Sequence, residues 1–489
     1  MSDQPNILLI TDDQHRWDFF GDTGAAGPLR TPALDQLRRQ GSTLTQAFSN
    51  CPICMPARFI WYHGLYPSQA AQRLMANGHD WPSHLSTMPS ALRNAGYHTA
   101  VIGKIHSHGG LAHINLLDRQ DEQHRRGFDH VFEVSGKSLA TWRDCQWTEH
   151  LRRRGLLDDY RRDLVWRNPQ LNGEERFAPS FLQPADHADG LIGDTAARWL
   201  QDYDQTKPFF LHASFCGPHF PLDPPEQYVQ RHRWQDMPAP HGVTDPAQVR
   251  YWQRLRLLYV AMIEMIDDQV AHLLDVLDRR GLTRNTVVLF ASDHGDMIGD
   301  LRHNHKCLPY DGSCRTPITV RYPGVVPAGA RLDQMVESAD LPCTLIELAT
   351  GGDRAAELLP QTPGRSFWSY LLGRTPAHRD WAYAECDTWA DKSAYPQGPR
   401  HRQSWRMCCE RDWKFVFHHD GRQELYDRQH DPHEQHNVAA DPQHAAQRDR
   451  LRDRLIQSML HCVAPNTMPP RRPAPRVTLP ADRLRAASV

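Results

Sequence analysis

The chain alternates between short, continuous apolar runs and longer segments in which apolar residues recur every three or four positions. Runs of strand length lie at 6–10, 98–102, 209–214, 285–291 and 317–321. Segments with helical spacing lie at 31–40, 86–95 and 253–280. Buried strands that alternate with helices are typical of α/β proteins. The pattern predicts a doubly wound, mostly parallel sheet between helices, with ligands bound beyond the carboxyl ends of its strands.

The pattern changes after about residue 374, where short alternating runs at 381–384, 405–409 and 413–418 precede a helical segment at 451–460. We therefore predict a main α/β domain over 1–375 and a smaller C-terminal α+β domain, built on an antiparallel sheet, over 376–465. Residues 107–205 are rich in Arg, His and Asp, and we expect this segment to be irregular and to cap the site.

Residues 466–489 form a tail in which prolines and arginines interleave, five of each between 469 and 485. Such a segment favours extended conformations and cannot form a core of its own. It fits a disordered terminus, or an arm that packs on a neighbouring subunit through the apolar stretch 477–479. The second interpretation predicts a homo-oligomer.

Composition excludes several classes of protein. The 489 residues are 40% hydrophobic and 23% charged, as in soluble globular proteins. The 56 basic and 58 acidic residues leave no global field for nucleic acid or an anionic membrane, and no apolar run approaches the roughly 18 residues of a membrane span. The N-terminal residues lack a secretory pattern and the 11 cysteines are odd in number, so we expect a cytoplasmic protein with reduced thiols.

Acidic residues follow two of the predicted strands. Asp12 and Asp13 come directly after the first strand, and Asp293 and His294 follow the strand at 285–291. Each pair alone fits a helix cap or a turn. Two strand ends that each deliver a carboxylate could also converge on one hard divalent cation.

A second candidate is the segment Cys51-Pro-Ile-Cys54-Met-Pro-Ala-Arg58, which contains both C-x-x-C and C-x-P-x-R. A C-x-x-C pair could be a redox dithiol or half of a zinc site. No second Cys or His pair follows at finger-like spacing, which disfavours zinc. Cys51 by itself also fits a small buried hydrophobe.

Taken in order, these motifs resemble the sulfatase family, which belongs with the alkaline phosphatases in one superfamily. The matching segments are NILLITDDQ (6–14), CMPAR (54–58), GYHTAVIGKIH (96–106), PH (218–219), SDHGD (292–296) with GD (299–300), Lys306, WKF (413–415) and ELYD…DP (424–432). They span residues 5 to about 440. The resemblance implies an alkaline phosphatase-like fold, with a mixed, mostly parallel sheet sandwiched by helices.

The resemblance also implies a sulfuric ester hydrolase of the formylglycine type. A modification enzyme would oxidise Cys54 to formylglycine, whose metal-bound hydrate attacks sulfur. Loss of a proton from the second hydroxyl would then expel sulfate and restore the aldehyde. The implied metal ligands are Asp13, Gln14, Cys54 (as formylglycine), Asp293 and His294. Oxygen-rich ligation favours Ca²⁺, with Mn²⁺ or Mg²⁺ as alternatives.

The remaining implied roles concern the nucleophile and the transferred group. Arg58 lies one helical turn from Cys54 and would fix the hydrate. Lys104 and His106, expected on one face of an extended segment, would bind the hydrate and the sulfate oxygens. His219 and Lys306 would neutralise the transferred group and protonate the leaving oxygen. Further implied contacts of the substrate are Asn77, Lys104, His219 and Lys306.

Two questions stay open in the sequence. The first ligand pair is either Asp13 with Gln14, which we favour, or Asp12 with Asp13. Gln14 also occurs in family branches similar to choline sulfatases and phosphonate monoester hydrolases, so a phosphonate monoester or phosphodiester substrate is the alternative to a sulfate ester. Outside this enzyme class, a dithiol redox protein that uses Cys51 and Cys54, or a binding protein on an inactive scaffold, remain the competing hypotheses.

Overall fold

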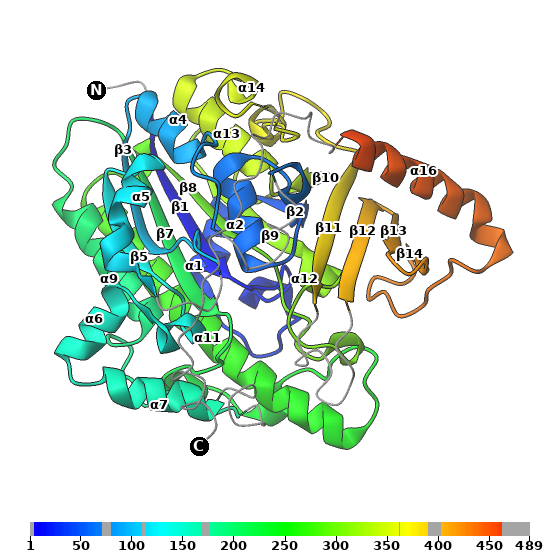
Figure 1. Cartoon of the computed structure of the whole chain (residues 1–489), viewed down its shortest axis with the longest axis horizontal. Helices are drawn as coiled ribbons and strands as arrows, with labels where there is room; N and C mark the ends of the chain where they lie inside the picture. Colours follow the sequence, from blue (N-terminus) through cyan, green and yellow to red (C-terminus); the bar gives the residue numbers. More distant parts are fainter. Residues whose placement is uncertain are drawn as a thin grey trace, which may run out of the picture.

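The computed structural model describes residues 4–70, 80–109, 114–167, 176–360, 362–389 and 402–461. Its largest feature is an eight-stranded sheet in the order β10-β2-β9-β8-β1-β7-β3-β5 (Figure 1). The strands are β1 (Asn6–Asp13), β2 (Ser42–Phe48), β3 (His98–Lys104), β5 (His130–Val134), β7 (Phe209–Pro218), β8 (Thr286–Ser292), β9 (Arg315–Arg321) and β10 (Ala330–Glu337). All neighbours are parallel except β9, which runs antiparallel to β8 and β2. This confirms the predicted mixed, mostly parallel sheet.

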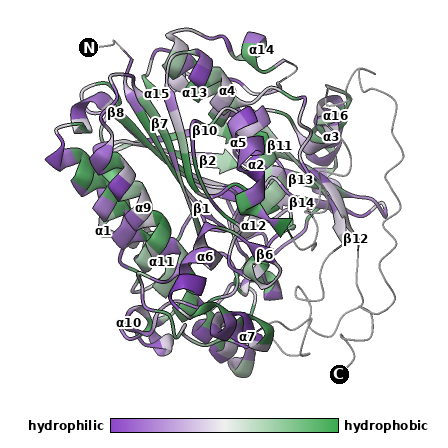
Figure 2. Cartoon of the chain, turned by 60° about the vertical axis from the view of Figure 1, so that its left-hand side comes forward, coloured by the Kyte–Doolittle hydropathy of each residue, from purple (hydrophilic) through white to green (hydrophobic). Residues whose placement is uncertain are grey.

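Helices cover both faces of the sheet because the strands are apolar on both sides. In β1, Ile7 and Leu9 belong to one core and Leu8 and Ile10 to the other. The first core is closed by α2 (Cys54–His63), α4 (Met88–Asn94) and α13 (Asp340–Thr350), and the second by α1 (Pro32–Gln40), α9 (Ala188–Asp202) and α11 (Pro246–Arg279). In Figure 2, α9 and α11 alternate between green and purple, as expected of helices with one buried side.

The expectation that residues 107–205 are irregular is wrong. The segment contains α5 (Gln120–Arg125), α6 (Gln146–Arg153), α7 (Leu157–Arg167), α9 and the edge strand β5, as well as the short pair β4 (Ile114–Asn115) and β6 (Arg143–Asp144). Helices α5, α6 and α7 bury few side chains, among them the large Trp147, Leu151 and Tyr160, whereas α9 buries nine of its fifteen residues. The many charges on the solvent side hide this periodicity in the sequence.

The C-terminal part is a separate antiparallel sheet, as predicted. Its strands β11 (Trp381–Trp389), β12 (Arg402–Glu410), β13 (Trp413–His418) and β14 (Gln423–Asp427) pair in sequence order, and α16 (Ala445–His461) packs on them (Figure 1). Residues 462–489 lie outside the described residues, so the arm and the homo-oligomer stay predictions. Among the helices that the structure describes, none is long and apolar enough to span a bilayer.

A buried ion network joins the two sheets. Asp311, in α12 (Asp311–Cys314), accepts from Lys414 Nζ at 2.5 Å, from Arg428 Nη2 at 2.9 Å and from Arg315 Nη1 at 3.3 Å. Burial alone would raise the pKa of Asp311, but Arg428, Lys414 and Arg315 hold it well below its ordinary value. Glu434 also contacts Lys414. The carboxylate of Asp311 therefore neutralises cations from both sides of the interface.

Asp311→Ala should lower the free energy of unfolding by about 3–5 kcal/mol, because it leaves buried cations without their partner. Denaturant titration of both proteins measures the change. Asp333→Ala is the control, since the ion pair of Asp333 with Arg411 is exposed and should contribute less than about 1 kcal/mol. Equal losses in the two variants would contradict the role of Asp311.

Candidate functional site

Four adjacent parallel strands end at one edge of the main sheet. In sheet order they are β8, β1, β7 and β3, and their carboxyl ends carry Asp293, Asp13, His219 and Lys104. Asp12 of β1 lies directly opposite Ser292 of β8, so the residues that follow, Asp13 and Asp293, come out of the sheet side by side. This edge is where an open α/β sheet binds its ligands.

Strand alternation decides which acid of β1 faces the site. Asp13 continues the row of Ile7 and Leu9, on the face covered by α2, whereas Asp12 continues the row of Leu8 and Ile10. The Asp12 side chain forms a hydrogen bond of 2.5 Å with His15 Nδ1, away from the cluster. The structure therefore places Asp13, and not Asp12, beside the other expected ligands.

Cys54 begins α2 and points into this edge. Its Sγ lies 3.5 Å from Asp13 Oδ1, 3.3 Å from His294 Nε2 and 2.9 Å from Lys306 Nζ. One ligand atom from each of Asp13, Cys54, Asp293 and His294 lies within 4.8 Å of the other three, and all four residues are buried. Four side chains, those of Asp13, Asp293, His294 and Lys306, thus meet at Cys54.

Arg58 lies one helical turn after Cys54 and is completely buried. Its Nε donates to Asp293 Oδ2 at 2.9 Å and its Nη2 contacts Asp13 Oδ2 at 3.3 Å. Its Nη1 donates to the carbonyl of Lys104 at 2.6 Å and to Ser214 Oγ at 2.8 Å. The guanidinium therefore fixes both carboxylates and contacts the end of β3 and the middle of β7.

Lys104 reaches the site, but the expected extended geometry through His106 is wrong. Strand β3 ends at Lys104, and His106 has a left-handed backbone with φ of 64°. Gly103, with φ of 120°, also interrupts the alternation; a Cβ there would lie 1.9 Å from the carbonyl oxygen of Ser214. Lys104 Nζ donates to Asp13 Oδ2 at 2.5 Å. His106 stays close enough for Lys104 and Asp13 to affect its pKa, and its Nδ1 has no hydrogen-bond partner among the described residues.

Lys306, Gln14 and His219 complete the site. Lys306 Nζ donates to Gln14 Oε1 at 2.5 Å as well as contacting Cys54. His219 donates from Nδ1 to the carbonyl of Phe220 at 2.6 Å, so Nε2 is the nitrogen that remains for a substrate. Asn77 lies outside the described residues.

Burial and neighbouring charges shift the pKa values of several groups in the site. Burial would raise the pKa of Asp13, but Lys104, His219, Arg58 and Lys306 hold it well below its ordinary value. Burial, with the nearby Asp13, raises the pKa of the Cys54 thiol. Burial lowers the pKa of His294, whose Nδ1 donates to the carbonyl of Gly295 at 3.0 Å. The lone pair of His294 Nε2 therefore faces Cys54, as a metal ligand requires.

The donor set fits a hard divalent cation. Two carboxylates, one imidazole and the amide oxygen of Gln14 surround position 54. Oxygen ligands with one imidazole suit Ca²⁺, Mn²⁺ or Mg²⁺, whereas a soft metal would require more thiolate ligands. Arg58, Lys104 and Lys306 provide three further positive charges, which suits a tetrahedral anion.

The two cysteines of the C-x-x-C segment have different surroundings. Cys51 lies in a hydrophobic core with Phe48 and Cys386, and burial raises the pKa of its thiol well above the ordinary value. Both thiols are free, and the polar contacts of Cys54 are with Asp13, His294 and Lys306. This arrangement gives no support to a dithiol redox centre.

Two residues of the site were not assigned from the sequence. Ser214 accepts from Arg58 and donates to the carbonyl of Lys104 at 2.7 Å, and Asp296 contacts the amide of Gln14. A polar residue inside the apolar run at 209–214 was the available signal for Ser214. Asp296 stood within a quoted motif, but its partner could not be read from the spacing.

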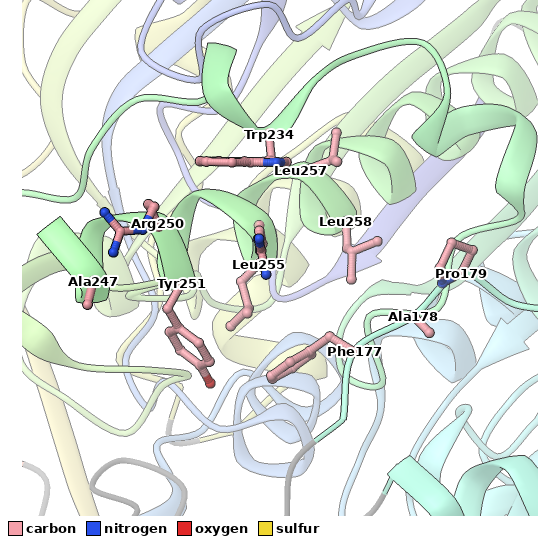
Figure 3. Close-up of a pocket in the computed structure, with 11 residues that line it drawn as sticks. Phe177, Ala178, Pro179, Trp234, Ala247, Arg250, Tyr251, Leu255, Leu257 and Leu258 are labelled. Carbon is pink, nitrogen blue, oxygen red and sulfur yellow. The ribbon is translucent and has the colours of Figure 1, made fainter.

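A separate hollow of about 560 Å³ lies beside α11 (Figure 3). Aromatic and aliphatic side chains such as Phe177, Trp234 and Tyr251 line it, together with Arg250 and Arg254. None of its described lining residues is an acid, a histidine or a cysteine. The chemistry of the protein is therefore expected at the sheet edge and not here.

Comparison with known proteins identifies the family of the chain. Residues 5–352 match the sulfatase family, and residues 299–460 match the N-sulphoglucosamine sulphohydrolase C-terminal family. An arylsulfatase of Clostridium perfringens is 26% identical over 93% of this chain and 94% of its own length, and a choline-sulfatase of Rhizobium meliloti is 28% identical over 90% and 83%. The phosphonate monoester hydrolase of Agrobacterium radiobacter has a similar fold, with a TM-score of 0.75 and 24% identity over 94% of this chain and 96% of its own. The chain therefore belongs to the sulfatase family and is a hydrolase of that family.

Proposed function

We propose that the protein hydrolyses a sulfate ester, with formylglycine at position 54 as the nucleophile and one hard divalent cation beside it. The observation that carries this proposal is the convergence of Cys54, inside a C-x-P-x-R segment, with Asp13, Asp293 and His294. Asp13, Gln14, Asp293 and His294 would hold the cation together with the oxygen of residue 54. The cation would supply Lewis-acid polarisation of the nucleophile and of a sulfate oxygen.

Protein side chains would orient the nucleophile, accept its proton and bind the sulfate oxygens. Arg58 would orient the hydrate of residue 54, since its guanidinium is already fixed by both carboxylates. His106, whose pKa burial and Lys104 hold well below the ordinary value, is neutral and could accept the hydrate proton that is lost when sulfate leaves. Lys104 and Lys306 would bind the sulfate oxygens, because both ammonium groups reach this cluster.

His219 would protonate the leaving alcohol oxygen from Nε2. Burial, with Lys306 nearby, lowers the pKa of His219 well below its ordinary value. An anionic substrate would raise the affinity of the ring for a proton, because it places negative charge beside it. A modification enzyme that oxidises Cys54, a role for Asn77 with the substrate and a cytoplasmic location remain part of this proposal.

The alternative substrate is a phosphonate monoester or phosphodiester. Gln14 is the residue that favours it, and both substrate classes are tetrahedral and carry one negative charge. We favour the sulfate ester because the arylsulfatase and choline-sulfatase relatives match over at least 83% of their length, whereas the likeness to the phosphonate monoester hydrolase is one of fold.

The nucleophile is tested by Cys54→Ala, with Cys51→Ala as the matched control. We expect Cys54→Ala to lower kcat by at least about 10³-fold, because the attacking group is lost. Cys51→Ala should keep most of the activity, since Cys51 points into a core. Peptide mass analysis of active wild-type enzyme should show conversion at Cys54 only. An unmodified Cys54 in fully active enzyme would overturn the formylglycine assignment.

The cation site is tested by comparing Asp13→Asn with Asp12→Asn. Asp13→Asn should weaken Ca²⁺ binding more than about 100-fold, beyond the loss typical of an outer-shell residue. Asp12→Asn removes a carboxylate of equal burial on the opposite face of β1 and should leave binding close to wild type. Equilibrium dialysis of metal-free protein measures both. The opposite ranking would make Asp12 the ligand.

Substrate class is tested by kcat/KM on an aryl sulfate and on an aryl phosphonate monoester with the same leaving group. We expect the sulfate to be the better substrate. Because the leaving group is shared, the ratio reports on the transferred group alone. A higher value for the phosphonate would establish the alternative function on the same site.

A further inference from the structure

Gln14 has an unusual position for a side chain that would bind a metal. Its backbone is left-handed, with φ of 77°, which non-glycine residues seldom adopt without a functional reason. Its N–H donates to Asp293 Oδ1 at 3.0 Å, and its carbonyl accepts from Tyr259 at 2.5 Å. The backbone of Gln14 is therefore fixed from both sides.

A fixed backbone does not settle which end of the carboxamide faces the site. The amide has a donor end, Nε2, and an acceptor end, Oε1, and only oxygen can coordinate a hard cation. With Nε2 facing the cation, Gln14 would present two N–H donors to a positive charge. The orientation of this amide therefore decides whether Gln14 can be a ligand at all.

Asp296 and Lys306 hold the two ends of this amide. Gln14 Nε2 donates to Asp296 Oδ2, and Gln14 Oε1 accepts from Lys306 Nζ, which itself lies 2.9 Å from Cys54 Sγ. Rotation of the amide by half a turn would set oxygen against the Asp296 carboxylate and N–H against the Lys306 ammonium. Both contacts would then be repulsive, so the two charges select one orientation.

Asp296 is well placed to impose this choice. It is 2% exposed, and its Oδ1 accepts from the N–H of Ile298 at 2.8 Å, which leaves Oδ2 for Gln14. Two titratable groups also face Asp296: His305, whose Nδ1 lies 3.9 Å from Oδ2, and Tyr259, whose pKa burial and Asp296 raise well above its ordinary value. Lys306 is only partly buried and is also expected to contact the substrate. Its hydrogen bond to Gln14 Oε1 is therefore expected to change during turnover.

We propose that Asp296 is a positioning residue that locks the Gln14 carboxamide with Oε1 toward position 54, and so makes Gln14 a competent ligand for the divalent cation. This inference rests on the proposed function, because it presupposes a cation at this edge. Asp296 is assigned no contact with the substrate. Its effect on cation binding passes through Gln14 alone.

A double-mutant cycle tests this proposal by Ca²⁺ binding to metal-free protein, without any turnover assay. Asp296→Asn keeps the size of the side chain but no longer dictates the amide orientation, and it should weaken Ca²⁺ binding about 10–100-fold. In the Gln14→Ala background the same substitution should have no further effect, because its target is gone. Asp12→Asn is the control for loss of a buried carboxylate nearby.

Each outcome decides between the possibilities. Asp296→Asn with wild-type affinity overturns the inference alone, and so does an equal loss in both backgrounds, which would indicate a direct effect of the Asp296 charge. Wild-type protein that binds no Ca²⁺, Mn²⁺ or Mg²⁺ overturns the proposed cation site and this inference with it. If Asp296→Asn does not fold, Asp296→Ser, which also removes the charge, enters the same cycle.

Discussion

The whole site depends on one buried guanidinium. Arg58 is completely buried, and its guanidinium makes four hydrogen bonds, to Asp293 after β8, to Asp13 of β1, to the carbonyl of Lys104 at the end of β3 and to the hydroxyl of Ser214 within β7. Burying either carboxylate alone in its ionised form would be costly, and burying the Arg58 guanidinium alone would be costly as well. The two acids and Arg58 are therefore acceptable only together, and their shared geometry fixes the position of α2.

Because α2 is fixed in this way, its first residue is fixed as well. Cys54 and Arg58 are one turn apart, so the helix that anchors the guanidinium also presents position 54 to the cluster. Lys104 and Lys306 add positive charge on two sides. The site is therefore a set of fixed charges at strand ends and at the start of a helix. Such a preorganised arrangement stabilises the charge that develops on a transferred anionic group.

The second sheet contacts the elements of this site through packing and through a hydrogen bond. Cys51, Ile53 and Ile60 lie in the same core as Trp405 and Phe415 of the C-terminal sheet, immediately behind the start of α2. Trp405 Nε1 donates to the carbonyl of Cys307, the residue after Lys306. The antiparallel sheet therefore supports both α2 and the loop that carries Lys306, although it supplies none of the expected ligands.

The sequence by itself determined the fold class, the C-terminal sheet and most of the candidate site. Continuous apolar runs predicted the central strands β1, β3, β7, β8 and β9, because strands buried on both faces need no polar alternation. It did not predict β2, β5 and β10, which carry mixed or polar residues such as Thr45, Glu133 and Asp333 near the sheet edges. Motif order likewise indicated Cys54, Asp13 and Asp293 before any coordinates, because several motifs in the same order resemble those of the sulfatase family.

Only the tertiary structure decided how these residues face one another. Alternation along β1 separates Asp12 from Asp13 whatever the fold, but which of them meets Cys54 depends on the face that α2 covers, and this is set by packing between residues far apart in the chain. The left-handed backbone of His106 and the contact between Gln14 and Asp296 arise in the same way. Such contacts join strand ends and loops more than 200 residues apart, and no local pattern of side chains encodes them.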